Sequence, residues 1–383
     1  MSKAAYGLEM DYETTLPTNS CDYFYDVEVS LQNSSCYQPT PQFTTESEIK
    51  GLVLGVMAAL SLVGNTATVI SIIIVKHRKR MKSSVYILIC HLSVADLFVT
   101  FACITTESVW TFTVQWLGGN FLCKFLKYLQ LFSLYLSTFI LVLIGLDRYY
   151  AVKYPMRRSD IQKRIGYGIA FVYFLSAIFS IPQLLVFHVL KGPFPEEFYQ
   201  CVTYGLYTAK WQEQLYMSFG LVCMFILPLT IITFTYLMTF ITLKKSERVF
   251  RCERTTLGKT CPEFNRRRLL RKAKMKALKI SVIIVLAFIV CWTPYYTLMI
   301  ISMIFDADNM LFKKLQNRIF CFGMSNSLVN PIIYGAFHLC HCKRKRSSVR
   351  LVQPRSRTPN TVTTSIKRQS SHQDFVMSLV MRL

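Results

Sequence analysis

Charged residues are scarce in this sequence. Only 17% of its 383 residues are Asp, Glu, Lys or Arg, whereas 52% are hydrophobic and the mean hydropathy is +0.34. Soluble globular domains carry about 25% charged residues. The composition therefore excludes an ordinary soluble domain of this size and favours a protein embedded in a membrane.

The sequence also lacks strand-length segments in which apolar and polar residues alternate, and this excludes a transmembrane β-barrel. It has instead seven apolar runs, each long enough to cross a hydrocarbon core of about 30 Å as a helix. We predict an all-α membrane protein, a bundle of seven transmembrane helices. The expected spans are 51–75, 85–109, 122–152, 165–190, 215–243, 277–305 and 319–338.

Two further function classes are disfavoured by missing patterns. The sequence shows no nucleophile beside a base and no metal-ligand spacing, so we do not expect an enzyme. It also lacks the paired repeats, the broken helices and the file of polar residues through the spans that are typical of transporters and channels. A transporter or channel stays the alternative from a different class.

Acidic residues are few, 21 against 44 Lys and Arg, which gives a net charge of +23. The basic residues gather in the loops after the first, third and fifth spans and in the tail, and such loops stay cytoplasmic during insertion. We predict a multi-pass plasma-membrane protein with an extracellular N-terminal segment, 1–49, a bundle domain, 50–342, and a cytoplasmic tail, 343–383. Basic charge beside spans suits anionic lipids, so we expect membrane-lipid partners and no nucleic acid. Asn33 begins a glycosylation sequon on the extracellular side.

The thirteen cysteines divide by compartment. Four would face the oxidising exterior, Cys21, Cys36, Cys123 and Cys201, and they allow three pairings. We favour Cys123–Cys201, which would join the outer end of the third span to the second outer loop, together with Cys21–Cys36. An N-terminal cysteine that reaches the outer loop is the alternative.

The tail begins with features of a short membrane-surface helix. Its start combines apolar residues with "KRKR", and this pattern suits a helix lying on the membrane surface. We expect Cys340 and Cys342 to be palmitoylated.

An ion pair stands at the inner end of the third span, in "LDRYYAV". Arg148 lies 25 residues beyond Cys123, which is about 37 Å along a helix and enough to cross the core. At this boundary an arginine is either an interfacial anchor or part of a switch. In the second interpretation Asp147 holds the guanidinium in one state and releases it to a cytoplasmic partner in another.

Six motifs in order, one in each of six spans, resemble those of rhodopsin-like G-protein-coupled receptors. They are "GN" at 64–65, "HLSVADL" at 91–97, "LDRYYAV" at 146–152, "FILPL" at 225–229, "CWTPYY" at 291–296 and "NSLVNPIIY" at 326–334. The resemblance covers about residues 50 to 342. It implies heterotrimeric G proteins as partners, with arrestin and receptor kinases acting on the Ser- and Thr-rich tail. Ion flux without any G protein would favour the transporter alternative.

The resemblance also assigns roles to polar residues within the spans. A cluster of polar residues at the core of the bundle would hold an allosteric sodium ion, the single cofactor we expect. The alternative is a purely structural hydrogen-bond network without an ion, which would need the same residues. Its expected members are Asn65, Asp96, Asn326, Ser327 and Asn330. Tyr334 would be the partner of Arg148 when that arginine moves.

Residues in the outer half of the bundle are expected to bind the ligand. Glu107 lies 11 residues beyond Asp96, almost three helical turns, so the two should point the same way. We expect an aromatic, polar and slightly acidic cavity, with ordinary core packing as the alternative. Its expected residues are Glu107, Gln130, Trp292, Tyr295 and Tyr296. Gln130 replaces the aspartate of aminergic receptors and Met324 the lysine of opsins, which leaves a peptide as the favoured ligand.

Longer segments narrow the resemblance. Residues 110–156, 204–216, 291–300 and 322–338 are similar to the gonadotropin-releasing-hormone receptor superfamily, above all to arthropod adipokinetic-hormone receptors. That resemblance implies a short amidated peptide agonist, with corazonin and adipokinetic/corazonin-related peptide as alternatives. Two departures stand out. Tyr173 replaces a common tryptophan, and Lys274 replaces an acid that some members use to lock the arginine, so we assign the restraint of Arg148 to Asp147 alone.

Overall fold

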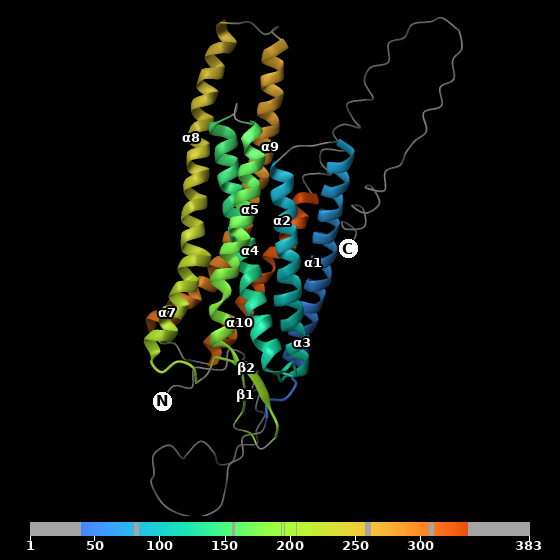
Figure 1. Cartoon of the computed structure of the whole chain (residues 1–383), viewed down its shortest axis with the longest axis vertical. Coiled ribbons are helices and arrows are strands. Elements are labelled where there is room, and N and C mark those ends of the chain that lie inside the picture. Colours follow the sequence, from blue (N-terminus) through green and yellow to red (C-terminus); the bar gives the residue numbers. More distant parts are fainter. Residues whose placement is uncertain are drawn as a thin grey trace, which may run out of the picture.

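Helices make up nearly all of the chain that the computed structural model describes, which is residues 40–79, 84–154, 158–192, 194, 196–203, 205–256, 262–305 and 310–335. The helices lie side by side as an elongated bundle (Figure 1). In the first half of the chain they are α1 (Thr45–Lys79), α2 (Ser84–Val99), the π-helix η1 (Thr100–Thr105), α3 (Thr106–Thr113), α4 (Gly119–Lys153), α5 (Arg158–Ser180) and α6 (Pro182–Val186).

A two-stranded hairpin then interrupts the helices. Strands β1 (His188–Lys191) and β2 (Tyr199–Val202) pair antiparallel, with Val189 opposite Cys201. The second half follows as α7 (Lys210–Leu221), the π-helix η2 (Val222–Ile226), α8 (Leu227–Thr256), α9 (Pro262–Phe305) and α10 (Met310–Met324). After a turn at Ser325 the chain is helical again over 326–335.

The two ends of the bundle differ. The hairpin lies at one end, which we call the hairpin end, and α8 and α9 project together beyond the other helices at the opposite end (Figure 1). Arg148 lies near the C-terminal end of α4, opposite the hairpin end, so we call this end of the bundle the arginine end. The distance between Cys123 and Arg148 along α4 is about 37 Å at 1.5 Å per residue, which separates the two ends by the thickness of a membrane.

Six helical stretches of the described residues are long and apolar enough to cross a membrane, and they match the first six predicted spans. They are Thr45–Ile74, Ser84–Thr113, Gly119–Lys153, Lys163–Val186, Lys210–Lys245 and Leu278–Phe305. The seventh predicted span, 319–338, is divided at Ser325 between α10 and the helical segment 326–335, and residues beyond 335 lie outside the described part. The expected surface helix and the tail, 343–383, lie there as well.

Two predicted boundaries are wrong. The fourth span was expected to reach residue 190, but the helix ends at Val186 and residues 188–191 form β1, because their backbone groups pair with β2. The first helix begins at Thr45, inside the segment 1–49 that was expected to precede the bundle. Thr44 explains this start, since its Oγ1 accepts a hydrogen bond of 3.2 Å from the Ser47 N–H and caps the helix.

The exterior of the bundle is apolar. On α5 the rings of Tyr167, Phe171 and Phe174 are 77%, 60% and 63% exposed. Fully buried side chains such as Leu92, Tyr135 and Phe288 form a core in the middle of the bundle. Large apolar side chains on both the inside and the outside are what lipid requires, since a surface in water would be polar.

Candidate functional site

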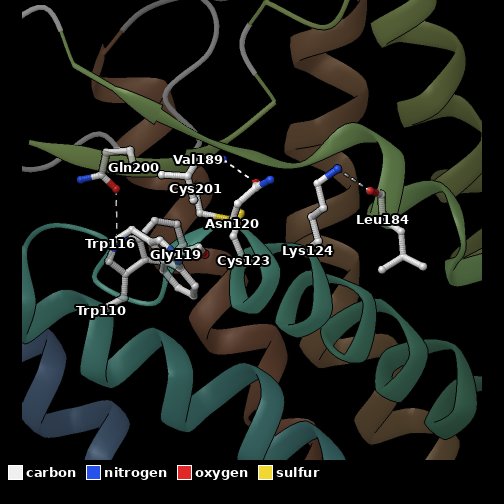
Figure 2. The surroundings of a disulfide bond; sticks show 10 residues. All are labelled: Trp110, Trp116, Gly119, Asn120, Cys123, Lys124, Leu184, Val189, Gln200 and Cys201. Carbon is white, nitrogen blue, oxygen red and sulfur yellow. Dashed lines mark hydrogen bonds between the residues drawn. A yellow bond between two sulfur atoms is a disulfide. The ribbon is translucent and has the colours of Figure 1, made fainter.

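The hairpin end is fixed by the Cys123–Cys201 disulfide, which confirms the first predicted pairing. It joins β2 to the first turns of α4 (Figure 2). Two hydrogen bonds support it: Asn120 Oδ1 accepts from the Val189 N–H at 3.1 Å, and the Trp110 indole donates to Gln200 Oε1 at 3.1 Å. Cys21, Cys36, Asn33, Cys340 and Cys342 lie outside the described residues.

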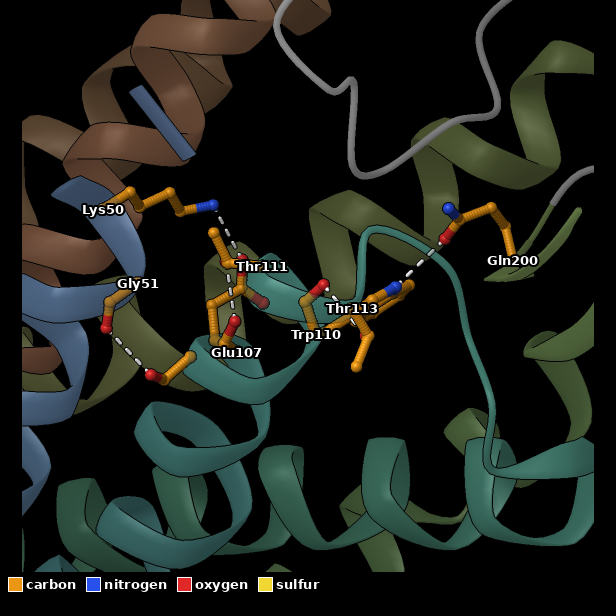
Figure 3. A network of polar contacts seen from close by, with 8 residues as sticks. Lys50, Gly51, Glu107, Trp110, Thr111, Thr113 and Gln200 are labelled. Carbon is orange, nitrogen blue, oxygen red and sulfur yellow. Dashed lines mark hydrogen bonds and ion pairs between the residues drawn. The ribbon is translucent and has the colours of Figure 1, made fainter. Parts of the chain in front are cut away.

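Glu107 is buried at this end and forms an ion pair with Lys50 of α1. Lys50 Nζ lies 3.0 Å from Glu107 Oε1, and the carboxylate side chain is only 9% exposed (Figure 3). Ser108, the next residue, ties the same helices together through a 2.9 Å hydrogen bond to the Gly51 carbonyl. Glu107 therefore contacts α1 through Lys50, a partner that the sequence prediction did not name.

A cavity of about 390 Å³ opens beside this ion pair, between α1, α3 and α10. That volume lies within the range of about 300–1,000 Å³ that is typical of small-ligand sites. Its wall is mixed, and includes Lys50, Leu54, Trp110, Asn317, Arg318 and Cys321. Arg318 also pairs with Glu46 of α1 across its mouth.

Two lysines, which the expectation of a slightly acidic cavity did not include, offset the charge of Glu107. Lys50 neutralises Glu107, and a second lysine, Lys127 of α4, lies close enough to interact with the same carboxylate electrostatically. The sequence prediction missed both lysines. Spacing could have identified Lys127 as a residue of the same site, because it precedes Gln130 by three residues and therefore lies on the same face of the helix.

The predicted aromatic residues do come together. The ring centre of Trp292 lies 6.0 Å from Tyr295, 6.1 Å from Tyr296 and 6.0 Å from Phe320. Tyr296 stacks in turn on Phe225 of η2, with centres 4.5 Å apart. The bundle therefore separates the predicted ligand residues into a charged group around Glu107 and an aromatic group around Trp292.

Gln130 lies on α4, opposite η1. Its carbonyl accepts from the Ser133 hydroxyl at 2.8 Å and is approached by the Cys103 thiol at 3.7 Å. The side chain is half-buried.

Four of the five residues of the expected polar cluster form two hydrogen-bonded pairs, Asp96 with Asn330 and Asn65 with Ser327. One carboxylate oxygen of the fully buried Asp96 accepts from Asn330 Nδ2 at 2.8 Å, and the other accepts from the Ser137 hydroxyl at 3.1 Å. Asn65 Nδ2 donates to the Ser327 carbonyl at 3.0 Å. Ser137 is a member that the sequence prediction missed, although it lies on the interior stripe of α4.

A cavity of about 20 Å³ adjoins the cluster, and Asn326, the fifth expected member, lines it with Asp96 and Ser137. This is room for about one water or one small ion. The side-chain oxygens of Asn65, Asn326 and Asn330 are buried without a hydrogen-bond partner. Carboxylate, amide and hydroxyl oxygens are ligands that suit a hard cation, so the residues present fit a sodium ion.

Arg148 and Asp147 form a buried ion pair at the arginine end. Both contact Ser84, the first residue of α2: its hydroxyl donates to Asp147 Oδ2 at 3.2 Å and accepts from Arg148 Nη2 at 3.3 Å. The prediction that Asp147 alone restrains the arginine is therefore incomplete, because a hydroxyl on the neighbouring helix completes the contact.

Two tyrosines lie in the same half of the bundle. Tyr334 is buried in the helical segment 326–335, and its hydroxyl has no hydrogen-bond partner. Tyr236 of α8 lies beside Gly145 of α4, where a Cβ would come within 3.0 Å of Thr235 Oγ1, so glycine allows α8 to approach α4 closely. In this structure the polar partners of Arg148 are Asp147 and Ser84, and Tyr334 is not among them.

The family model described as "7 transmembrane receptor (rhodopsin family)" matches residues 64–334. The gonadotropin-releasing hormone receptor of Octopus vulgaris is 37% identical over 341 residues, covering 85% of this chain and 81% of that protein. The gonadotropin-releasing hormone II receptor of Callithrix jacchus is 34% identical over 313 residues, covering 79% of each. The chain belongs to the rhodopsin-family G-protein-coupled receptors, within the gonadotropin-releasing-hormone receptor superfamily.

As a member of this superfamily the receptor is a multi-pass plasma-membrane protein, binds a peptide hormone and couples to a G protein without being an enzyme. One departure from the family pattern has a local explanation. The Tyr173 hydroxyl lies 3.2 Å from His91 Nδ1, and the two rings meet edge to face at 5.8 Å. Tyr173 therefore joins α5 to α2. The side chain of Lys274 lies outside the described part of the structure.

Proposed function

We propose that the receptor responds to a short amidated neuropeptide of the adipokinetic-hormone type. The aromatic group around Trp292, which includes Tyr295 and Tyr296, supports this most directly, because aromatic side chains suit a blocked, largely uncharged peptide. The segments that resemble adipokinetic-hormone receptors give the finer assignment.

Peptides of corazonin, adipokinetic/corazonin-related and gonadotropin-releasing-hormone type are the second candidates. The last of these is favoured by the names of the relatives, which are 37% and 34% identical to this chain. The test is to express the chain in cells, apply amidated peptides of all four types, and measure calcium and cyclic nucleotides. Activation by an adipokinetic peptide at the lowest concentration supports the proposal, and a lower threshold for another type replaces it.

We place the hairpin end outside the cell and the arginine end inside. Lys and Arg concentrate in the loops at the arginine end, and this asymmetry supports the assignment. The peptide would contact Glu107, Gln130, Trp292, Tyr295 and Tyr296 and would bind better to an active bundle shape. In that shape the inner end of α9 moves outward and Arg148 leaves Asp147 for Tyr334, which opens a groove for a helix of the G protein.

Sodium is proposed as an allosteric ion of the inactive shape. Asp96, Ser137 and Asn326 would hold it, since they line the small cavity, and Asn330 would support them through its hydrogen bond to Asp96. The ion would neutralise the Asp96 carboxylate within the low dielectric of the bundle.

Modifications complete the proposal. Glycosylation of Asn33, a Cys21–Cys36 disulfide, palmitoylation of Cys340 and Cys342, and phosphorylation of the tail by receptor kinases to recruit arrestin are expected from the sequence. Patch-clamp recording in cells without G proteins separates the receptor from the transporter or channel alternative, because only the latter would pass an ion current.

A further inference from the structure

Lys127 is a cationic side chain in the outer part of α4 that lies between two aromatic rings. Its Nζ lies 4.8 Å from the ring centre of Trp110 and 5.1 Å from that of Phe187. Trp110 belongs to α3, and Phe187 directly precedes β1. Cation–π attraction therefore fixes the ammonium beneath the hairpin.

The ammonium has no carboxylate within ion-pair distance among the described residues, and no hydrogen bond from its Nζ is formed there. Glu107, which interacts with it from longer range, is already bonded to Lys50 at 3.0 Å. An ammonium carries three N–H donors. Ring faces attract its charge but supply no oxygen acceptor, so these donors are available to a ligand.

Helix spacing places Lys127 with the ligand residues. It lies one turn inward of the disulfide-bonded Cys123 and three residues before Gln130, on the same helix face. Across the interface, Cys103 of η1 meets the Gln130 carbonyl at 3.7 Å, and Glu107 lies one turn further out than Cys103. Lys127 and Glu107 thus oppose each other one layer nearer the hairpin.

We propose that Lys127 is a ligand-recognition residue whose ammonium binds an oxygen acceptor of the peptide, either a carbonyl or a carboxylate. The charges of Lys50, Glu107 and Lys127 sum to +1, so this layer attracts acceptors and disfavours a basic group. The inference rests on the proposed function in that it requires a peptide agonist. The net positive charge therefore favours hydrogen-bond acceptors of the peptide, whereas Glu107 alone would favour hydrogen-bond donors.

The test compares Lys127→Met, Lys127→Arg and Lys191→Met in the full-length receptor. Methionine keeps the length of the side chain and its ring contacts. Lys191 is the matched control, since it is a lysine of the hairpin whose ion pair with Glu197 is exposed. With the most potent peptide from the four-type screen, Lys127→Met should raise the half-maximal concentration about 10- to 100-fold, as loss of one charge-assisted hydrogen bond does.

Lys127→Arg should retain most of the potency, and Lys191→Met should stay within about 2-fold of the wild type. Unchanged potency of Lys127→Met would overturn the proposal. Two peptide analogues that differ only by Asn or Asp at one position identify the acceptor. If the Asp analogue is more potent on the wild type but not on Lys127→Met, the acceptor is a carboxylate. Equal potency of the two analogues indicates a carbonyl.

Thermal unfolding of the purified, ligand-free receptor gives the second measurement. Methionine keeps the contacts with both rings and removes the cost of desolvating a charge, so Lys127→Met should unfold at the wild-type temperature or above. A lower unfolding temperature would show that Lys127 serves to hold the hairpin, and would overturn the inference. If no peptide activates the wild type, the proposed function fails, and this second measurement still decides whether Lys127 is structural.

Discussion

Gly323 offers a direct test of how tightly Trp292 is held. Gly323 lies near the end of α10, and a Cβ placed on it would lie 2.9 and 3.0 Å from two carbons of the Trp292 ring. The ring is only 6% exposed and is enclosed by Tyr295, Tyr296 and Phe320. It cannot yield without moving those neighbours, so Gly323→Ala should disturb the aromatic group.

The size of the effect comes from comparison with Gly220 of α7, where a Cβ would meet no atom within 4 Å. Replacing a helical glycine by alanine stabilises a protein by about 0.5–1 kcal/mol when the space is open. Overpacking costs about 1–3 kcal/mol. Because both variants share the helical gain, the difference between them, about 1–3 kcal/mol in favour of Gly220→Ala, isolates the steric conflict at Trp292.

The assay is thermal unfolding of detergent-purified receptor in the presence of a thiol-reactive fluorophore. Cys103 and Cys291 are 2% and 5% exposed, so they react when the bundle opens. Gly220→Ala should unfold at or above the wild-type temperature and Gly323→Ala below it. Equal stability of the two variants would refute the close packing of Gly323 on Trp292.

Four further outcomes are expected. Arg148→Ala should abolish peptide-evoked second messengers while surface expression stays near the wild-type level, and retained signalling would remove its proposed role. Asp96→Asn should abolish the effect of sodium on agonist affinity, which we expect to be about 5-fold or more in the wild type. Cys123→Ser should lower the free energy of unfolding by about 2–4 kcal/mol, seen as a lower unfolding temperature and less receptor at the surface. Glu107→Gln should weaken peptide potency. Lys50→Met should mainly reduce the free energy of unfolding, by about 1–3 kcal/mol, because it removes the ion-pair partner of a buried carboxylate. The same loss of stability in both variants would contradict the assignment of Glu107 to ligand binding and Lys50 to stability.

The positions of the helices were predictable from the sequence because a membrane fixes the length and polarity of each span. The disulfide between Cys123 and Cys201 was predictable from compartment and spacing. The ends of the helices were less predictable, since they depend on local contacts. Thr44 starts α1 by capping it, and β1 replaces the last turn of the fourth span by pairing with β2.

The orientation of Glu107 could not be predicted, because η1 lies between it and Asp96. Helix counting assumes 3.6 residues per turn throughout, but a π-turn contains an extra residue. Each extra residue rotates the remainder of the helix by roughly 100°. The π-helix over Thr100–Thr105 therefore changes the direction expected for Glu107, and no pattern in the sequence predicted it.

The small cavity at the polar cluster connects the proposed ligand residues with the proposed switch. Trp292 and Tyr296 line it together with Asp96 and Asn326. Because the cavity has a volume of only about 20 Å³, an inward shift of Trp292 must expel its contents or displace Asn326. Asn326 and Asn330 lie on the helical segment that carries Tyr334 toward the arginine end. We therefore expect a peptide that moves the aromatic group to act on this segment through contacts between neighbouring side chains, with the polar groups around Asp96 opposing or favouring the movement.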